Sequence, residues 1–274
     1  MNTSYNFFYS LILTFLLIGC SGSHDQQESS NLLENGRWID LTHTYNEDAI
    51  FWPTAQEFNL DTVSHGHTEA GYFYAAFNFS MAEHGGTHLD APIHFAEGKW
   101  ASHEIPVDRF SGKGAVIDVS EKTVKNRDYQ ISRQDFEDWE ARHAEIPDGA
   151  IVLVNTGSAQ FWPDKQRYMG TAARGEEAIP KLHFPGLAPE AARWLVENRN
   201  IKAFGLDTPS IDYGQSKEFM SHRILYEENI IGIENVANLD KLPAKGFYAF
   251  AFPMKIKGGS GGPLRIAALV PKGE

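Results

Sequence analysis

Residues 83–95 read Glu83-His84-Gly85-Gly86-Thr87-His88-Leu89-Asp90-Ala91-Pro92-Ile93-His94-Phe95. Three histidines and one aspartate fall within eleven residues of this run, mixed with small residues. The Gly85-Gly86 pair and Pro92 disfavour a helix here. Glycine reaches backbone dihedrals that are closed to other residues, so a turn at the pair can direct several imidazoles toward one point. We therefore expect residues 83–95 to turn tightly as they leave a strand at 72–81.

Imidazole and carboxylate side chains in such a turn are suitable ligands for a divalent metal. His88 and Asp90 are two positions apart, so in extended chain they project from the same side. Zinc, manganese and iron(II) all accept these nitrogen and oxygen ligands, and catalysis requires a site with open positions. A single histidine is more often a hydrogen-bonded core or surface residue, but four candidate groups in one turn favour a metal site. Because one loop rarely supplies a whole site, we expect further ligands elsewhere, with His222 and Glu234 as the best candidates.

Outward from this turn, short β-rich runs alternate with a few helical segments. The expected strands cover residues 38–42, 72–81, 115–119, 150–155, 201–206, 230–234, 247–256 and 264–270. Two helices are well signalled, one capped by Ser132 and one opened by Pro189. Aromatic alternation in residues 72–79 suits a strand whose two faces are both at least partly covered. Many strands and few long helices favour an α/β domain built as a β-rich mixed sheet or barrel with outer helices.

Composition and charge exclude several classes of protein. The chain has 274 residues, of which 42% are hydrophobic, enough to bury the core of one domain or two small ones. A net charge of -12 and the lack of a long basic run argue against nucleic acid as a partner. The single cysteine excludes a disulfide framework and a Cys-rich zinc module.

The N-terminus resembles a bacterial lipoprotein signal peptide. Residues 7–19 form an apolar run that is short for a membrane-spanning helix, which needs roughly 20 residues, but fits the h-region of a signal peptide. Residues 17–20, Leu-Ile-Gly-Cys, resemble the lipobox, which implies cleavage before Cys20 and lipid attachment to its sulfur. Residues 1–10 lack the usual Lys or Arg, and the alternative is a buried hydrophobic helix with a structural cysteine.

The expected organisation follows from this resemblance and from the polar stretch after Cys20. We expect a signal peptide at 1–19, a lipid-anchored flexible linker at 20–36 and a folded domain at 37–274. The protein would then contact the membrane only through its lipid, on the extracytoplasmic side, either periplasmic or at the cell surface.

Three blocks of sequence resemble the metal-dependent cyclase family, which includes the bacterial kynurenine formamidases and the isatin hydrolases. The first and most specific block is residues 84–94, His-Gly-Gly-Thr-His-Leu-Asp-Ala-Pro-Ile-His. The second is residues 204–212, Phe-Gly-Leu-Asp-Thr-Pro-Ser-Ile-Asp, continued by 222–239, and the third is Gly-Gly-Pro-Leu-Arg-Ile-Ala-Ala at 261–268. The resemblance covers nearly the whole of 38–271.

Carried over position by position, the resemblance implies a metal centre and a catalytic residue. The implied ligands, the last two completing the site when a second ion binds, are His84, His88, Asp90, His222 and Glu234. His94 matches the catalytic histidine of the family. The implied cofactor is a divalent metal, zinc or manganese, with one or two ions per subunit.

The resemblance extends to the substrate side and to the fold. Phe51-Trp52-Pro53 is similar to an aromatic and proline segment of the family, although Thr54 and Ala55 replace the glycine and aspartate that often follow. We expect Phe51, Trp52 and Phe95 to contact the substrate, with core packing as the alternative for each one singly. The family fold is a swivelling β/β/α fold, and its members usually form dimers or tetramers, which implies a homodimer or homotetramer here.

The activity that the resemblance implies is hydrolysis of a carbon–nitrogen bond by water that the metal activates. The substrate would be a small aromatic amide, N-formyl compound or lactam, as for an arylformamidase or an isatin hydrolase. His94, with an ordinary pKa near 6.5, would take a proton from the water and pass it to the leaving nitrogen. The competing hypothesis is a non-catalytic lipoprotein that binds a metal or a small ligand.

Two other patterns, a G-x-S-x-G match and a pair of histidines, are weaker indications of function. Residues 258–262, Gly-Gly-Ser-Gly-Gly, match the G-x-S-x-G elbow of serine hydrolases. That elbow requires a following helix, whereas Pro263 and a strand-like run come next, so we interpret the glycines as a flexible or substrate-covering loop. His65 and His67 are candidates for a second metal site, but two alternating histidines in a polar loop are usually solvated.

Overall fold

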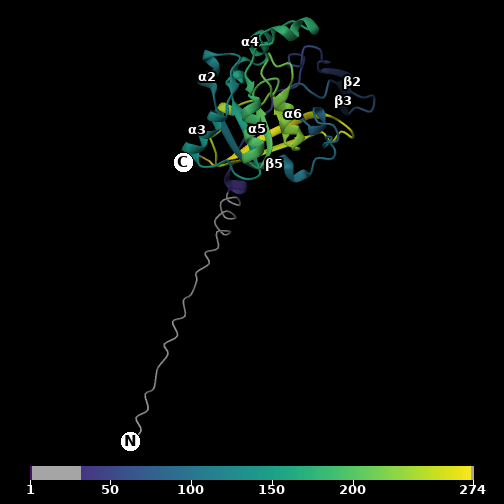
Figure 1. Cartoon of the computed structure of the whole chain (residues 1–274). Coiled ribbons are helices and arrows are strands. Elements are labelled where there is room, and N and C mark those ends of the chain that lie inside the picture. Colours follow the sequence, from purple (N-terminus) through teal and green to yellow (C-terminus); the bar gives the residue numbers. More distant parts are fainter. Residues whose placement is uncertain (2–31, 273–274) are drawn as a thin grey trace.

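The computed structural model describes residues 32–272 together with Met1 (Figure 1). The expected signal peptide at 1–19 and most of the expected linker at 20–36 lie outside the described residues. Among the helices that are described, none combines the length and the apolar character needed to cross a membrane.

A closed β-barrel forms the centre of the molecule. Within residues 32–272 the main sheet has eight strands in the order β1-β12-β11-β5-β7-β9-β10-β4, and β4 also pairs with β12. This last pairing closes the barrel, while β1 lies outside it against the far end of β12. The strands are β1 (Arg37–Asp40), β4 (His88–Asp90), β5 (Ser111–Asp118), β7 (Ala150–Asn155), β9 (Ile201–Leu206), β10 (Ile231–Glu234), β11 (Phe247–Pro253) and β12 (Gly261–Val270). The expectation of a β-rich mixed sheet or barrel with outer helices is confirmed, and the sheet closes as a barrel.

The parallel strands β7, β9 and β10 are almost entirely buried on both faces, as are residues 114–117 of β5. In β7, Val152 and Val154 join the apolar cluster beneath the helices, whereas Ile151 and Leu153 join the cluster inside the barrel. A strand covered on both faces needs a nearly continuous apolar run, which is what residues 150–155 supply. The sequence-based strands at 150–155 and 201–206 therefore coincide with β7 and β9.

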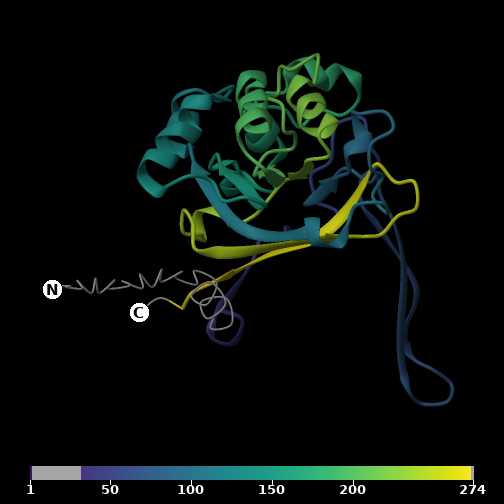
Figure 2. The same cartoon turned by 60° about the horizontal axis from the view of Figure 1, so that its bottom comes forward.

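Three helices lie together on one side of the barrel (Figure 2): α3 (Arg133–His143), α5 (Pro189–Asn198) and α6 (Met220–Glu227). Both expected helices are present. Ser132 caps α3 in a capping box with Asp135, and Pro189 occupies the first turn of α5. The shorter elements are α2 (Ser120–Lys125), α4 (Lys165–Met169), β6 (Gln130–Ile131), β8 (Gly186–Leu187) and the 3₁₀ turns η1 (Pro92–His94), η2 (Val107–Phe110), η3 (Ser158–Phe161), η4 (Glu176–Lys181) and η5 (Leu239–Lys241).

A two-stranded ribbon, β2 (Asn59–His67) with β3 (Phe73–Ser80), extends away from the body (Figure 2). We call residues 59–80 the arm. The expectation that both faces of residues 72–79 are at least partly covered is wrong, because all of β3 except Ala76 is exposed. The reason is that β3 pairs only with β2, so no second layer covers it.

The arm has one apolar face and one polar face. Cross-strand register places Leu60 beside Phe79, Thr62 beside Phe77 and His67 beside Phe73 on one face. The opposite face carries pairs such as Asp61 with Asn78. His65 and His67 pack their rings against Phe73, with centroids 5.4 and 5.8 Å apart, so they belong to this apolar face.

Candidate metal centre and its cavity

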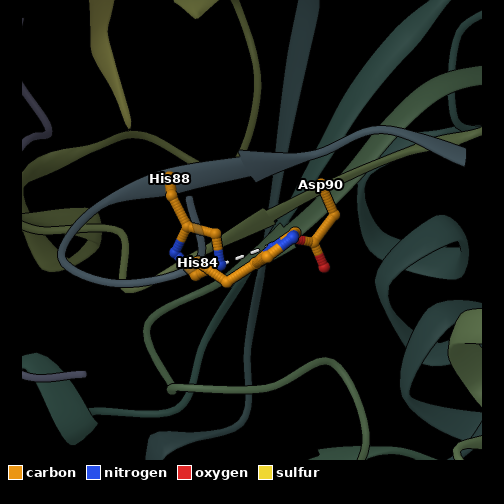
Figure 3. A group of neighbouring side chains, drawn as sticks. All are labelled: His84, His88 and Asp90. Atoms are coloured by element: carbon orange, nitrogen blue, oxygen red, sulfur yellow. Dashed lines mark hydrogen bonds and ion pairs between the residues drawn. The ribbon is translucent and has the colours of Figure 1, made fainter. Parts of the chain in front are cut away.

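Strand β4 carries His88 and Asp90 at the point where the barrel closes. Both residues are buried, and their spacing along the strand directs the two side chains to one side (Figure 3). The register of β10 against β4 places Glu234 directly opposite His88. Backbone pairing alone therefore brings two carboxylates and an imidazole together from strands far apart in sequence.

The glycine turn before β4 adds His84 to this group. Gly86 has a φ of +58°, in the left-handed region that favours glycine. Its carbonyl accepts hydrogen bonds from His88 Nδ1 at 3.0 Å and from the Asn235 side chain at 2.7 Å. The turn places His84 Nδ1 only 2.6 Å from Asp90 Oδ1 (Figure 3).

The five expected ligands lie together as two groups that share Asp90. In each group the ligand atoms are within 4.8 Å of one another: His84, His88 and Asp90 in one, and Asp90, His222 and Glu234 in the other. His222 Nε2 is 3.0 Å from Glu234 Oε1 and 3.6 Å from Asp90 Oδ2. The two oxygens of Asp90 thus face different histidines, which is the arrangement that a carboxylate between two ion positions requires.

Helix α6 supplies His222 and a tyrosine that the sequence analysis did not identify. Tyr226 lies one turn after His222, and its hydroxyl donates a 2.7 Å hydrogen bond to Asp90 Oδ2. Asp212 was also missed, and its carboxylate lies 2.6 Å from His222 Nδ1. The i, i+4 spacing of His222 and Tyr226 was the available signal for a shared helix face.

The charge balance of the centre fits a bound cation. Burial lowers the pKa of His88 and of His222, but close contact with negatively charged carboxylates outweighs it and raises each pKa to about 10. The buried carboxylates Asp90 and Glu234 therefore demand positive charge beside them. His88 Nε2 is buried and has no hydrogen-bond partner among the described residues, although both carboxylates lie within 3.4 Å. Imidazole nitrogens and carboxylate oxygens in this arrangement suit zinc or manganese.

His94 is placed beside the ligands rather than among them. It ends the 3₁₀ turn η1, and its ring stacks on His84 with centroids 3.8 Å apart. Burial is the main reason that its pKa is lowered to about 4, against the opposing charge of Asp90. His94 is therefore neutral at pH 7 and able to accept a proton.

A cavity of about 300 Å³ opens onto this centre. Trp52, Phe95 and Phe219 contribute aromatic rings to its wall, and His94 lines it together with the five expected ligands. Phe51 does not line the cavity, because its side chain is buried against Gly85. Phe219, and not Phe51, is the third aromatic residue of the wall, and no motif or spacing marks it for this position.

The fold and the site together define the class of protein: an α/β barrel with a buried His/Asp/Glu metal centre at the end of an aromatic cavity. Within that class, the chain belongs to the cyclase family, whose model matches residues 39–213. An isatin hydrolase of Roseibium aggregatum is 35% identical over 210 residues, covering 74% of this chain and 77% of the relative. A kynurenine formamidase of Bacillus cereus is 28% identical over 235 residues, covering 85% of this chain and 97% of the relative.

Solved structures agree with this assignment. Isatin hydrolase A from Labrenzia aggregata, bound to benzyl benzoate, matches with a TM-score of 0.80 and 35% identity. The match covers 91% of this chain and all of that one. The resemblance inferred from residues 84–94 is therefore confirmed over nearly the whole described domain.

Proposed function

We propose that this protein is a metal-dependent amidohydrolase that cleaves a carbon–nitrogen bond in a small aromatic amide, N-formyl compound or lactam. The observation that carries the proposal is the convergence of three imidazoles and two carboxylates at the end of an aromatic cavity, with the neutral ring of His94 alongside. The names of the isatin hydrolase and kynurenine formamidase relatives support the same substrate class.

The residues of the site have three different roles: metal binding, proton transfer and contact with the substrate ring. A divalent ion held by the five ligands would act as a Lewis acid and lower the pKa of a water molecule at the site. His94 lies in the cavity wall, where it accepts the proton of the attacking water and returns it to the leaving nitrogen. Trp52, Phe95 and Phe219 provide apolar surface on which a flat ring can stack. We propose zinc or manganese as the metal, with a second ion when His222 and Glu234 also bind.

Measurement of metal content and turnover tests this function. Purified protein, loaded with Zn²⁺ or Mn²⁺ or stripped with a chelator, is assayed with N-formylkynurenine and with isatin. We expect turnover of at least one substrate with either metal and none after stripping. The competing hypothesis, a non-catalytic lipoprotein, predicts tight binding of these compounds without turnover.

We further propose that the chain is exported and anchored as a bacterial lipoprotein. The apolar run at 7–19, Cys20 and the polar stretch that follows support this location. We expect palmitate to label the protein in cells and Cys20→Ser to abolish that labelling. Labelling that persists in Cys20→Ser would contradict the proposal.

We propose a homodimer, or a homotetramer built from such dimers, in which the arm of each protomer packs on the other. A two-stranded ribbon is marginally stable alone, so the apolar face of the arm needs a covering surface. Strands of this length form a ribbon about 30 Å long and 10 Å wide, or about 300 Å² a face. In a two-fold pair each protomer buries its own arm and the surface that receives the other, on the order of 600 Å², which approaches the roughly 800 Å² per partner of a standard interface.

A further inference from the structure

The glycine-rich loop before β12 contacts the metal centre through one serine. Ser260 Oγ lies 2.8 Å from His84 Nε2, the ring nitrogen that faces away from Asp90. The same serine donates two hydrogen bonds to Glu83 Oε2, from its backbone nitrogen at 2.9 Å and from its hydroxyl at 2.7 Å. Glu83, Ser260 and His84 therefore form a continuous hydrogen-bonded chain that ends at the centre.

The direction of each hydrogen bond in this chain is determined. An ionised carboxylate only accepts, so the hydroxyl proton of Ser260 points to Glu83. Toward His84, the hydroxyl oxygen can then only accept, and Nε2 must carry the proton. In the neutral form that a metal requires, the ring therefore has its lone pair on Nδ1, the atom that contacts Asp90 Oδ1 at 2.6 Å.

Glycines on both sides of Ser260 allow the loop to lie close to His84 and Glu83. A Cβ at position 261 would lie 2.7 Å from His84 Cε1 and 2.4 Å from the carbonyl oxygen of Leu89, and one at position 259 would lie 2.6 Å from Glu83 Oε1. At position 261 only glycine fits without displacing the backbone, and a side chain at 259 would displace the carboxylate of Glu83. The Ser260 carbonyl also accepts a 2.8 Å hydrogen bond from the backbone of Ala91, which fixes the loop to the segment that carries the ligands.

The other two imidazoles of the centre are held in the same manner. The Nδ1–H of His88 donates a hydrogen bond to the carbonyl of Gly86, and the Nδ1–H of His222 donates one to the carboxylate of Asp212. An acceptor on the outer nitrogen fixes the tautomer and the orientation of a metal-binding histidine. His84 differs in that Nε2 is the nitrogen turned away from the centre. Its hydrogen-bond acceptor is the hydroxyl of Ser260, which Glu83 orients.

We propose that Glu83 and Ser260 are positioning residues that hold His84 with Nδ1 toward the metal. Glu83 acts through Ser260, which is the residue that touches the ring. Because the ring of His94 stacks on His84, the same pair also sets the position of the proton acceptor. This inference rests on the proposed metal-dependent function and assigns a role to the Gly-Gly-Ser-Gly-Gly segment, which was interpreted from sequence as a flexible or substrate-covering loop.

Metal affinity is the first test. The affinities of full-length protein for Zn²⁺ and for Mn²⁺ are measured by chelator competition in Ser260→Ala, Glu83→Ala and the double variant. We expect each single variant to bind about 10- to 100-fold more weakly than the parent protein. The double variant should bind no more weakly than Ser260→Ala, because the two residues act in series. Glu83→Gln retains an acceptor oxygen and should recover most of the affinity.

A spectroscopic readout separates orientation of the ring from a general structural effect. In protein labelled with ¹⁵N-histidine and loaded with Zn²⁺, we expect His84 to show its proton on Nε2, in contrast to His88 and His222. That proton should exchange faster with solvent in Ser260→Ala. Lys257→Ala, an exposed change in the same loop, is the matched control and should leave affinity, exchange and thermal stability unchanged.

The outcomes distinguish this inference from the proposed function. If the parent protein binds metal and hydrolyses substrate, but Ser260→Ala and Glu83→Ala bind metal within about twofold of it, the positioning role is wrong. Additive losses in the double variant would also overturn the serial arrangement. A parent protein that binds no divalent ion would instead defeat the proposed function itself.

Discussion

His94 differs from the other histidines of the centre in what surrounds it. His88 and His222 lie against buried carboxylates, which raise the pKa of each to about 10, whereas burial lowers the pKa of His94 to about 4. The environment thus separates the candidate ligands His88 and His222, which lie beside carboxylates, from the neutral ring of His94, which can accept a proton.

Replacement of His94 by alanine should separate metal binding from turnover. The ring stacks on a ligand but is not needed for either group of metal-binding atoms, so His94→Ala should retain its metal by elemental analysis. Loss of the proton acceptor should lower kcat roughly 100- to 10,000-fold. His183→Ala, an exposed histidine paired with Asp128, is the control and should keep full activity. Full activity in His94→Ala would remove this residue from the mechanism.

His43 is a half-buried histidine outside the metal centre, stacked on Trp162 with centroids 4.0 Å apart. Burial lowers its pKa from 6.5 to about 4. The unfolded chain therefore takes up a proton at higher pH than the folded protein, and stability falls as the pH drops from about 6.5 to about 4. The loss is at most about 3 kcal/mol.

His43→Phe should remove this part of the acid sensitivity, because a phenyl ring can still stack on Trp162 but does not titrate. The free energy of unfolding in urea is measured for both proteins between pH 7.5 and pH 4, with chelator present so that metal loss does not contribute. As the pH falls, the unfolding free energy of the parent protein should decrease more than that of His43→Phe. Parallel curves would show that His43 is not the group responsible.

At the residue scale the sequence reveals the candidate ligands but not the residues that orient them. His84, His88 and Asp90 can be assigned because they lie within seven residues of one another. Tyr226 and Ser260 come from positions 136 and 176 residues away from their partners, so only the folded chain brings them to the centre. A tyrosine or a serine has no spacing that marks it as a partner of a distant ligand.

At the scale of elements, sequence prediction succeeds where packing and local pattern agree. Continuous apolar runs identify β7 and β9, and the Ser132 cap identifies α3. Strand β2 is missed because Asn-Leu-Asp-Thr-Val-Ser-His-Gly-His is mostly polar and becomes a strand only through pairing with β3. Helix α6 is missed because no side-chain cap signals its start. The residue that precedes it, Phe219, has a left-handed backbone conformation.

The glycine turn before β4 provides a test at the same scale, with a matched control on the arm. Gly86 and Gly71 both have positive φ, at +58° and +88°. A Cβ on Gly86 would lie 2.4 Å from the ring of Tyr45, whereas one on Gly71 would meet nothing within 4 Å. We expect Gly71→Ala to cost about 1 kcal/mol of stability and to leave metal affinity unchanged.

Gly86→Ala should be more destabilising than Gly71→Ala, and it should also weaken metal binding, since the Gly86 carbonyl orients His88. Thermal unfolding and chelator competition measure the two effects separately. Equal metal affinity in both variants would show that the turn does not position the ligand.

At the scale of the whole molecule, the arm is the feature with the clearest consequence. Its apolar face should hold two protomers together, so Phe73→Ser with Phe77→Ser should raise the dimer dissociation constant roughly 100-fold or more. Tyr74→Ser removes an aromatic ring of similar exposure from the opposite face of β3 and is the matched control. Sedimentation velocity measures the change, and a parent protein that is monomeric at all concentrations would contradict the proposal.

The closed barrel is a property that sequence patterns alone could not establish. Alternating strands and helices indicate a β-rich α/β domain, but closure depends on β4, which has only three residues, pairing with β10 and β12 at once. Pairing of this kind is decided by register between segments more than 130 residues apart. No local run of residues carries that information.

One consequence of this closure joins metal supply to the survival of the fold. The three residues of β4 bridge the two ends of the curved sheet, and two of them, His88 and Asp90, are proposed ligands, so an ion bound there would hold the two ends together. Any ion that binds the folded chain in preference to the unfolded one adds its binding free energy to the stability of the barrel. For this protein, a shortage of metal would therefore lower the stability of the folded chain as well as its hydrolytic activity.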